Sequence, residues 1–319
     1  MSLQSTFDRT LPAQITHGWR LLTTPVWNHE TSRLRAPLRA ILPLILTFLA
    51  FAAIQTAASE QLSHPAREVA TAVGLAVTLV VSVVITARFI DRRPIREYGL
   101  GVDREWSSSF VVGSAVGVLV NAGTLLVAVT AGWAEITGFA TGSDALPFLP
   151  AMLLVFGYIG VAATWEEFVM RGAMLKNMAE GGSNLLPRWV AVSMAVLGSS
   201  GIFALMHSGK LAHPSQAGYY LLAGLIFGTV YVLSGDLALP IGFHVFYNFS
   251  MSAVFGLGVS LHTPELIAVD IVGPAIWVGE EGLLRVLFAF VGSVLLIGYI
   301  RWRDGQLQID DRITQWTSA

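Results

Sequence analysis

The sequence lacks cysteine and has few charged residues, and each shortage excludes a class of function. Without cysteine, disulfide bonds, thiolate metal ligands and cysteine nucleophiles are excluded. Charged residues make up 13% of the 319 residues, whereas an ordinary soluble domain has about 25%. The formal net charge of −2 gives no electrostatic reason to expect nucleic acid as a partner. A soluble globule of this composition would have almost nothing polar to present to water.

Hydrophobic residues make up 54% of the chain and the mean hydropathy is +0.64, which indicates a polytopic membrane protein. Eight apolar segments are each long enough to cross about 30 Å of hydrocarbon as a helix. These segments are residues 38–58, 68–87, 109–132, 147–165, 189–207, 217–234, 238–258 and 283–300. Their apolar runs are continuous rather than alternating, which excludes the spans of a β-barrel. The predicted fold is all-α, a polytopic transmembrane bundle of about eight helices.

Three regions follow from this division. Residues 1–36 form an N-terminal cytoplasmic segment, for which an interfacial helix and a frayed tail are both consistent with the sequence. Residues 37–300 form the membrane domain with its eight spans. Residues 301–319 form a cytoplasmic tail.

The basic residues predict the orientation of the bundle. Sixteen of the lysines and arginines fall in the termini and in the connections on the same side, whereas Arg67 and Lys210 fall on the other side. Because positive charge accumulates on the cytoplasmic side, we expect both termini to be cytoplasmic. Two lysines against seventeen arginines is typical of a GC-rich prokaryotic genome, so the membrane would be the cell membrane.

Ionisable side chains are costly within a bilayer, so those in the spans are the first functional candidates. At the end of the fourth span, Glu167 and Arg171 are four residues apart and can form an ion pair on a helix. Glu166 points about 100° away and remains available for other chemistry. This arrangement suits a general base held beside a fixed ion pair. It equally suits a charge cluster that anchors a helix end at the interface.

Two further motifs carry histidine. His207 follows Phe203 by four residues, and Asn248 follows His244 by four residues, so each pair lies on one helical face. A single core histidine would be unremarkable, but three successive polar motifs favour a common site. A glutamate and a histidine can hold and deprotonate water, while a histidine and an amide can donate to an oxyanion. The set therefore favours hydrolysis of a peptide bond within the membrane.

A metal-dependent alternative uses the same atoms. Glu166, His207 and His244 could form a two-histidine, one-carboxylate site for a divalent metal such as zinc. No cofactor is required by the residues themselves. The sequence leaves open whether the attacking water is bare or metal-bound.

The ordered runs EEFVMRG, FALMH and HVFYN resemble the CPBP family of intramembrane endopeptidases, which includes the CAAX prenyl proteases. The family signature is E-E-x-x-x-R, F-x-x-x-H and H-x-x-x-N, and the likeness covers about residues 147–255. The resemblance implies that Glu166 is the general base on water, assisted by His207. It also implies that His244 and Asn248 stabilise the oxyanion. Residues in supporting roles would be Glu167, Arg171 and Phe203.

The expected function is an intramembrane endopeptidase that acts on a membrane-associated or lipid-modified substrate. Its partners would be membrane lipid and a peptide or protein substrate, with no nucleic acid. One alternative is a non-catalytic membrane scaffold or immunity-type protein. A proton-coupled transporter is a further alternative, because glutamate and histidine within spans also form proton relays.

Two structural expectations accompany this function. A second Glu-Glu-x-x-x-Arg run begins at Glu280, and we interpret its acids as complementing a helix dipole, with Arg285 as an i+4 partner. The second expectation is that the fourth and fifth helices extend beyond the membrane and turn at residues 181–187. That turn would bring Glu166 and His207 to one depth, in a hydrated cavity that opens toward the cytoplasm.

Overall fold

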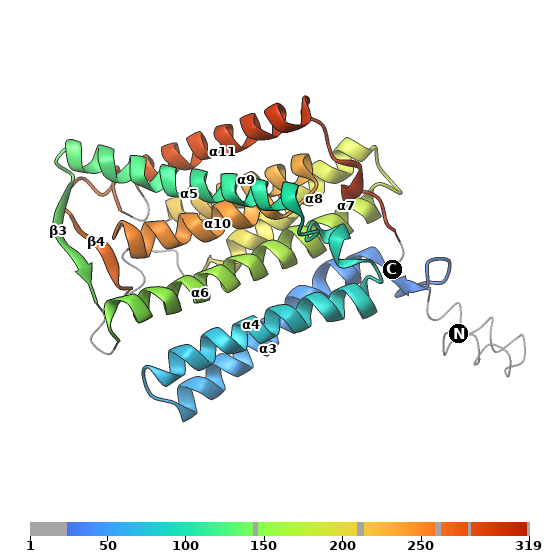
Figure 1. Cartoon of the computed structure of the whole chain (residues 1–319). Coiled ribbons are helices and arrows are strands. Elements are labelled where there is room, and N and C mark those ends of the chain that lie inside the picture. Colours follow the sequence, from blue (N-terminus) through green and yellow to red (C-terminus); the bar gives the residue numbers. More distant parts are fainter. Residues whose placement is uncertain (1–23, 143–145, 209–213, 259–262, 280–281, 318–319) are drawn as a thin grey trace, which may run out of the picture.

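A computed structural model describes residues 24–142, 146–208, 214–258, 263–279 and 282–317 (Figure 1). Most of the N-terminal segment expected to be helical or frayed lies outside the described residues. Its described part, from residue 24 to α3, forms a two-stranded hairpin. Glu280 also lies outside the described residues. The three domain boundaries stay predictions.

The chain order of elements is dominated by helices. The α-helices are α3 (Ala36–Gln61), α4 (Ala66–Ile85), α5 (Arg104–Thr130), α6 (Phe148–Glu167), α7 (Lys176–Gly182), α8 (Arg188–Met206), α9 (Pro214–Ser234), α10 (Ala238–Phe249) and α11 (Leu283–Asp304). The π-helical stretches are Thr86–Ile90, Phe168–Leu175 and Ser250–Val254, and the short 3₁₀ helices are Ile95–Tyr98 and Asp311–Ile313. The strands are β1 (Trp27–Asn28), β2 (Arg33–Leu34), β3 (Ala134–Thr141) and β4 (Glu265–Ile271).

Each of the eight predicted spans contains a helix, and the fold is the expected all-α membrane bundle. Among the described residues, six helices are long and apolar enough to cross a membrane by length and composition. The helices of the other two spans are α9, of which Gly218–Ser234 forms a shorter apolar helix, and α10, which has 12 residues. On α4, Val73, Val77 and Val80 are each more than half exposed, so a continuous apolar face points away from the protein. Such faces suit contact with lipid.

The fourth span continues well beyond its predicted end. α6, the π-helical stretch and α7 form one helix from Phe148 to Gly182, and α8 begins at Arg188. Glu166 therefore lies about 24 Å before the turn and His207 about 28 Å after it, at 1.5 Å per residue. The expected turn and the matched depth of the two residues agree with the structure.

Close packing of α5 against α10 fixes the centre of the bundle. A Cβ atom at Gly113 would lie 2.5 Å from the Leu239 carbonyl oxygen, so only glycine permits this approach. Asn121 on α5 donates hydrogen bonds to the Tyr247 carbonyl at 2.8 Å and to Ser250 Oγ at 2.9 Å. Both features hold α5 tightly against α10.

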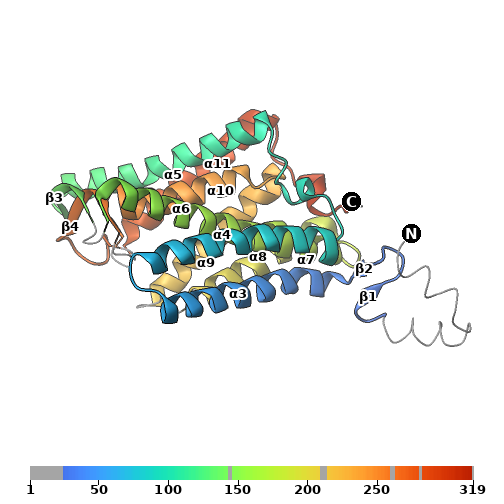
Figure 2. The ribbon, with the colours of Figure 1, turned by 60° about the horizontal axis from the view of Figure 1, so that its bottom comes forward.

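The end of the bundle that carries the hairpin β1–β2 and the C-terminal segment is held by buried charges (Figures 1 and 2). Glu180 on α7 forms ion pairs with Arg33, with Arg39 at 2.9 Å and with Arg93 at 2.6 Å. Asp91 pairs with Arg39 at 2.8 Å.

A ribbon of two antiparallel strands, β3 and β4, covers the opposite end of the bundle (Figure 2). Ala134 pairs with Ile271, and Thr141 pairs with Glu265. The sequence did not predict this ribbon. Its two strands are separated by more than 120 residues, so the pairing depends on the bundle that brings them together.

Candidate active site

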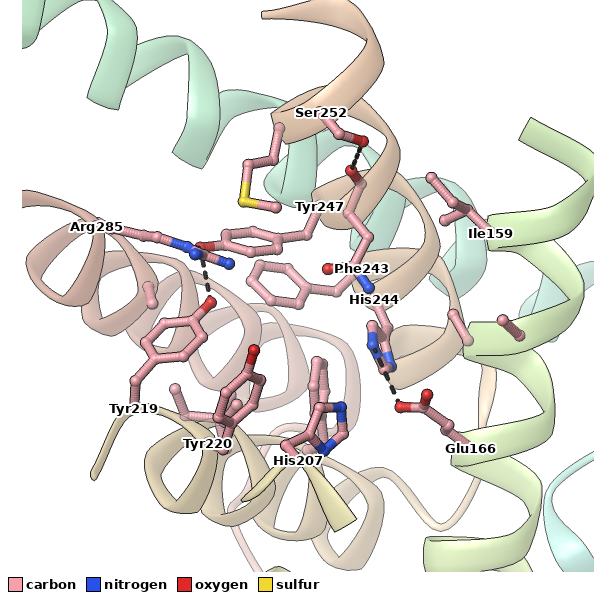
Figure 3. Close-up of a pocket in the computed structure, with 18 of the residues that line it drawn as sticks. Ile159, Glu166, His207, Tyr219, Tyr220, Phe243, His244, Tyr247, Ser252 and Arg285 are labelled. Carbon is pink, nitrogen blue, oxygen red and sulfur yellow. Dashed lines mark hydrogen bonds and ion pairs between the residues drawn. The ribbon is translucent and has the colours of Figure 1, made fainter. Parts of the chain in front are cut away.

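All four residues predicted to be catalytic line one cavity of about 240 Å³ (Figure 3). Glu166 comes from the end of α6, His207 follows α8, and His244 and Asn248 come from α10. Figure 3 shows Glu166 and His244 facing each other across one wall, with His207 at the base of the cavity. The three sequence motifs therefore converge on a single hollow in the bundle.

The change from α-helix to π-helix occurs directly after Glu166 and Glu167. Residues 168–175 form the π-helical stretch and are all buried. A π-helical turn changes the direction of successive side chains and is frequent at functional sites. In this protein the π-helical stretch lies between Glu166, which lines the cavity, and the charged cluster around Glu180.

Glu167 links two of the motifs. Its Oε1 accepts from Arg171 Nη1 at 3.1 Å, which is the predicted i, i+4 ion pair. The same oxygen lies 2.7 Å from Nδ1 of His244, 77 residues away. Both carboxylate and guanidinium are buried, and the Arg171 guanidinium lies over the rings of Phe203 at 4.6 Å and Phe227 at 5.0 Å. The ion pair therefore orients a cavity histidine, a role that the motif spacing does not reveal.

His244 faces a carboxylate on each side of its ring. Nδ1 contacts Glu167, and Nε2 lies 3.9 Å from Oε2 of Glu166. The ring stacks on Phe227, with 4.7 Å between centroids. Because carboxylates accept hydrogen bonds, both nitrogens can donate at once only when the imidazole is protonated.

His207 has a different partner. Its Nδ1 lies 2.8 Å from the carbonyl oxygen of Phe203, which can only accept, so this nitrogen carries the proton. In the neutral ring, Nε2 then has a lone pair. The ring packs between Phe203 at 4.5 Å and Tyr220 at 4.3 Å. Phe203 thus orients His207 both by its ring and by its carbonyl group.

Glu166 itself has no hydrogen-bond donor to Oε2 among the described protein atoms. Its side chain is about one-fifth exposed, and it lines the cavity. Asn248 lines the same cavity one helical turn beyond His244. A carboxylate, two imidazoles and an amide that share one cavity provide the groups needed to activate water and to stabilise an oxyanion.

The sequence interpretation missed a second polar group in the cavity wall. Arg285 donates from Nε to Tyr247 Oη at 2.9 Å, and Tyr219 Oη donates to the same oxygen at 2.9 Å. All three residues line the cavity. We expected Arg285 to pair with Glu281, which lies outside the described residues. An arginine within a span was the available signal, and its distance in sequence from the histidines obscured it.

Glu166, His207 and His244 line the same cavity, and Oε2 of Glu166 lies 3.9 Å from Nε2 of His244. Within the described part of the chain, no three His, Asp or Glu side chains are grouped as a metal site. The metal-dependent alternative stays a prediction.

The cavity lies in the half of the bundle away from the termini. Tyr219 near the start of α9 and Arg285 in the first turn of α11 line it, and both helices begin at the end that carries the β3–β4 ribbon. Toward the termini, the buried residues 168–175 fill the space. The expectation that the cavity opens toward the cytoplasm stays a prediction.

Residues 147–250 match the family model described as type II CAAX prenyl endopeptidase, Rce1-like. The matched region includes all three motifs and about a third of the chain, and the match is consistent with the resemblance to the CPBP family. It supports a membrane-embedded protease in general terms. No curated protein matches the chain.

Proposed function

We propose that the protein is an intramembrane endopeptidase that cleaves a membrane-associated peptide with Glu166 as general base. The observation that carries this proposal is the meeting of Glu166, His207, His244 and Asn248 in one cavity inside the region that matches the Rce1-like family model. The substrate class would be a peptide or protein held at the membrane, including prenylated or otherwise lipid-modified chains.

In the first step, Glu166 accepts a proton from water while the lone pair of His207 Nε2 orients that water. The oxygen attacks the peptide carbonyl carbon, and the carbonyl oxygen becomes an oxyanion. His244 and Asn248 donate hydrogen bonds to this oxygen, the contribution that is usually largest in acyl transfer. The tetrahedral intermediate then collapses as Glu166 returns the proton to the leaving amine.

Glu167, Arg171 and Phe203 would act through the histidines. Glu167 holds Nδ1 of His244, and Arg171 balances the charge of that carboxylate. Phe203 holds Nδ1 of His207. Each fixes the ring orientation that the reaction requires, and no step of this mechanism needs a metal ion.

We also propose that both termini are cytoplasmic, because the basic residues gather at that end of the bundle. In this orientation the cavity lies in the outer half of the cell membrane. The absence of cysteine allows a direct test with Thr317→Cys. A membrane-impermeant maleimide should label this variant only after the cells are opened, and labelling of intact cells would reverse the orientation.

The function is tested by comparing protein N-termini in membranes that contain wild type, Glu166→Gln or Glu280→Gln at matched levels. New N-termini that disappear only with Glu166→Gln would support proteolysis and identify substrates. Loss with Glu280→Gln but not with Glu166→Gln would overturn the site. No difference among the three membranes would favour a non-catalytic scaffold.

A further inference from the structure

The α4–α5 connection, residues 86–104, carries arginines on its surface at the end of the bundle that holds the termini (Figures 1 and 2). Its exposed or half-buried arginines are Arg88, Arg92, Arg96 and Arg104. None of these four side chains forms an ion pair or a hydrogen bond with another described residue. Two exposed acids, Asp103 and Glu105, lie beside them, so this surface keeps an excess of positive charge.

The arginines buried at the same end are used differently. They surround two carboxylates, Glu180 and Asp91, and they are Arg33, Arg39 and Arg93. Arg93 belongs to the α4–α5 connection itself, yet it is buried and lies 2.6 Å from Glu180 Oε2. The connection therefore directs one arginine inward to carboxylates and four arginines outward, where no described carboxylate pairs with them.

The backbone of the α4–α5 connection is fixed to the bundle. Asp91 is fully buried and accepts a hydrogen bond from Asn177 Nδ2 at 2.8 Å. The carbonyl oxygen of Gly99 accepts from the Leu237 amide at 3.0 Å and from Trp106 Nε1 at 2.9 Å. Gly99 has a φ of 89°, and a Cβ atom there would lie 2.6 Å from the Leu237 nitrogen. The outward arginines thus extend from a rigid support, which reduces the ordering cost of binding a ligand.

Apolar side chains are exposed between these arginines. Phe89, Ile95 and Val102 are each at least two-fifths exposed. The connection joins two helices that are long and apolar enough to cross a membrane, so it lies where the hydrocarbon ends. Alternation of apolar side chains with cations is typical of segments that lie in the headgroup layer. Arg92 also stacks on Trp27 at 5.1 Å, and tryptophan is enriched at this depth.

The opposite end of the bundle has the opposite charge. Strands β3 and β4 contain three acids, Glu135, Glu265 and Asp270, and neither strand contains lysine or arginine. A negatively charged lipid surface therefore complements the α4–α5 connection and not the ribbon. A soluble anion would not account for the exposed apolar side chains between the arginines.

We propose that the α4–α5 connection binds the headgroups of anionic phospholipids through its four outward arginines. A guanidinium forms paired hydrogen bonds with phosphate oxygens. Each basic residue near an anionic membrane surface strengthens binding about five-fold. This interaction surface is separate from the cavity that contains Glu166, and it does not depend on the proposed endopeptidase function.

Competition between two lipids tests the proposal. The full-length protein in detergent is mixed with equal amounts of phosphatidylglycerol and phosphatidylcholine, immobilised and washed, and the retained lipids are quantified by mass spectrometry. We expect about five-fold more phosphatidylglycerol than phosphatidylcholine at low salt. The excess should vanish at about 1 M salt, where charges are screened beyond about 3 Å. Equal retention of the two lipids at low salt, or an excess that survives high salt, would overturn the proposal.

Two matched sets of substitutions locate the binding surface. The excess should disappear when the four outward arginines are changed together, as Arg88→Gln, Arg92→Gln, Arg96→Gln and Arg104→Gln, and it should persist when the same four are changed to lysine. The control set removes the same charge from exposed arginines elsewhere, as Arg35→Gln, Arg67→Gln, Arg188→Gln and Arg301→Gln. Thermal unfolding in phosphatidylcholine shows whether each variant is folded. Equal loss of the excess in the two glutamine sets would overturn the proposal.

The depth of the connection provides a second measurement that keeps every arginine. Because the chain lacks cysteine, Val102→Cys can carry a single fluorophore. In nanodiscs that contain phosphatidylglycerol, both faces of the bilayer are accessible to quenchers. A spin label on lipid headgroups should quench the fluorophore more strongly than iodide in the water does. Strong quenching by iodide and none by the headgroup label would overturn the proposal.

Discussion

Two buried polar clusters lie on the same continuous helix, Phe148–Gly182, and they differ in how their carboxylates are paired. Near its end, Glu180 accepts hydrogen bonds from three arginines. About 21 Å earlier along the helix, Glu166 faces a cavity, and no described protein atom donates to its Oε2. Both carboxylates have charged side chains near them inside an apolar bundle. Of the two, only Glu166 lies beside a cavity that could hold a reacting group.

The contrast shows why burial of a charge does not by itself indicate chemistry. A carboxylate surrounded by guanidinium groups is held as an ion and joins the segments that supply them. In this protein the segments are the hairpin β1–β2, α3 and the connection before α5. Glu180 therefore links these three segments to α7 at the end of the bundle where the termini lie. A carboxylate beside a cavity can exchange a proton with water or substrate. The two clusters should therefore respond differently to the same substitution.

The largest expected effect is the loss of activity in Glu166→Gln. We expect kcat of the purified enzyme to fall about a thousand-fold, because the general base is removed. The thermal unfolding temperature should not fall, since Oε2 has no protein donor to lose. Cleavage of the substrate peptide and unfolding in detergent provide the two measurements. Substantial remaining activity would contradict the assignment of the base.

The converse substitution, Glu180→Gln, should reduce stability and leave the chemistry unchanged. Removing one partner of a buried ionic cluster costs about 3 kcal/mol, because three arginines would then share Asp91 alone. Unfolding in detergent should occur at a clearly lower temperature, while kcat of the folded fraction should match wild type. A fall in kcat at unchanged stability would remove the distinction between the two clusters.

Glu167→Gln should lie between these two cases, since Glu167 touches both an arginine and a cavity histidine. We expect kcat to fall about ten- to a hundred-fold, as observed for residues that orient a functional side chain. KM should change little, because Glu167 does not line the cavity and acts through His244. Glu167→Asp should recover part of kcat. An unchanged kcat in Glu167→Gln would contradict a positioning role for Glu167.

The smallest effect is expected at the surface. Asp311 pairs with Arg188 at 2.6 Å, but their side chains are 71% and 41% exposed. Exposed pairs contribute about 0–1 kcal/mol, so Asp311→Ala should change neither kcat nor, by more than about 1 kcal/mol, stability. The same unfolding assay provides the measurement. A loss as large as that of Glu180→Gln would show that the C-terminal segment contributes more than its exposed contacts suggest.

The sequence predicted the local features of the site because they repeat with the period of a helix. The pairing of Glu167 with Arg171 and the different direction of the Glu166 side chain follow from helical periodicity alone. The bond between Glu167 and His244 could not be predicted in the same way, since it joins α6 to α10 across 77 residues. The contact of Arg285 with Tyr247 could not be predicted for the same reason, since it joins α11 to α10 across 38 residues.

By itself, the sequence determined the fold class, the positions of the apolar helices and the residues of the three motifs, because hydrophobic length and helical periodicity are local properties. Tertiary structure decided which half of the bundle is filled by buried side chains. It also decided that Glu180, and not Glu166, is surrounded by arginines, and that Arg285 lines the cavity. Those outcomes depend on how helices with similar apolar faces pack together, and that packing is set by contacts such as the close approach of α5 to α10 at Gly113. The chemistry proposed here therefore uses residues that the sequence names and an arrangement that only the folded bundle provides.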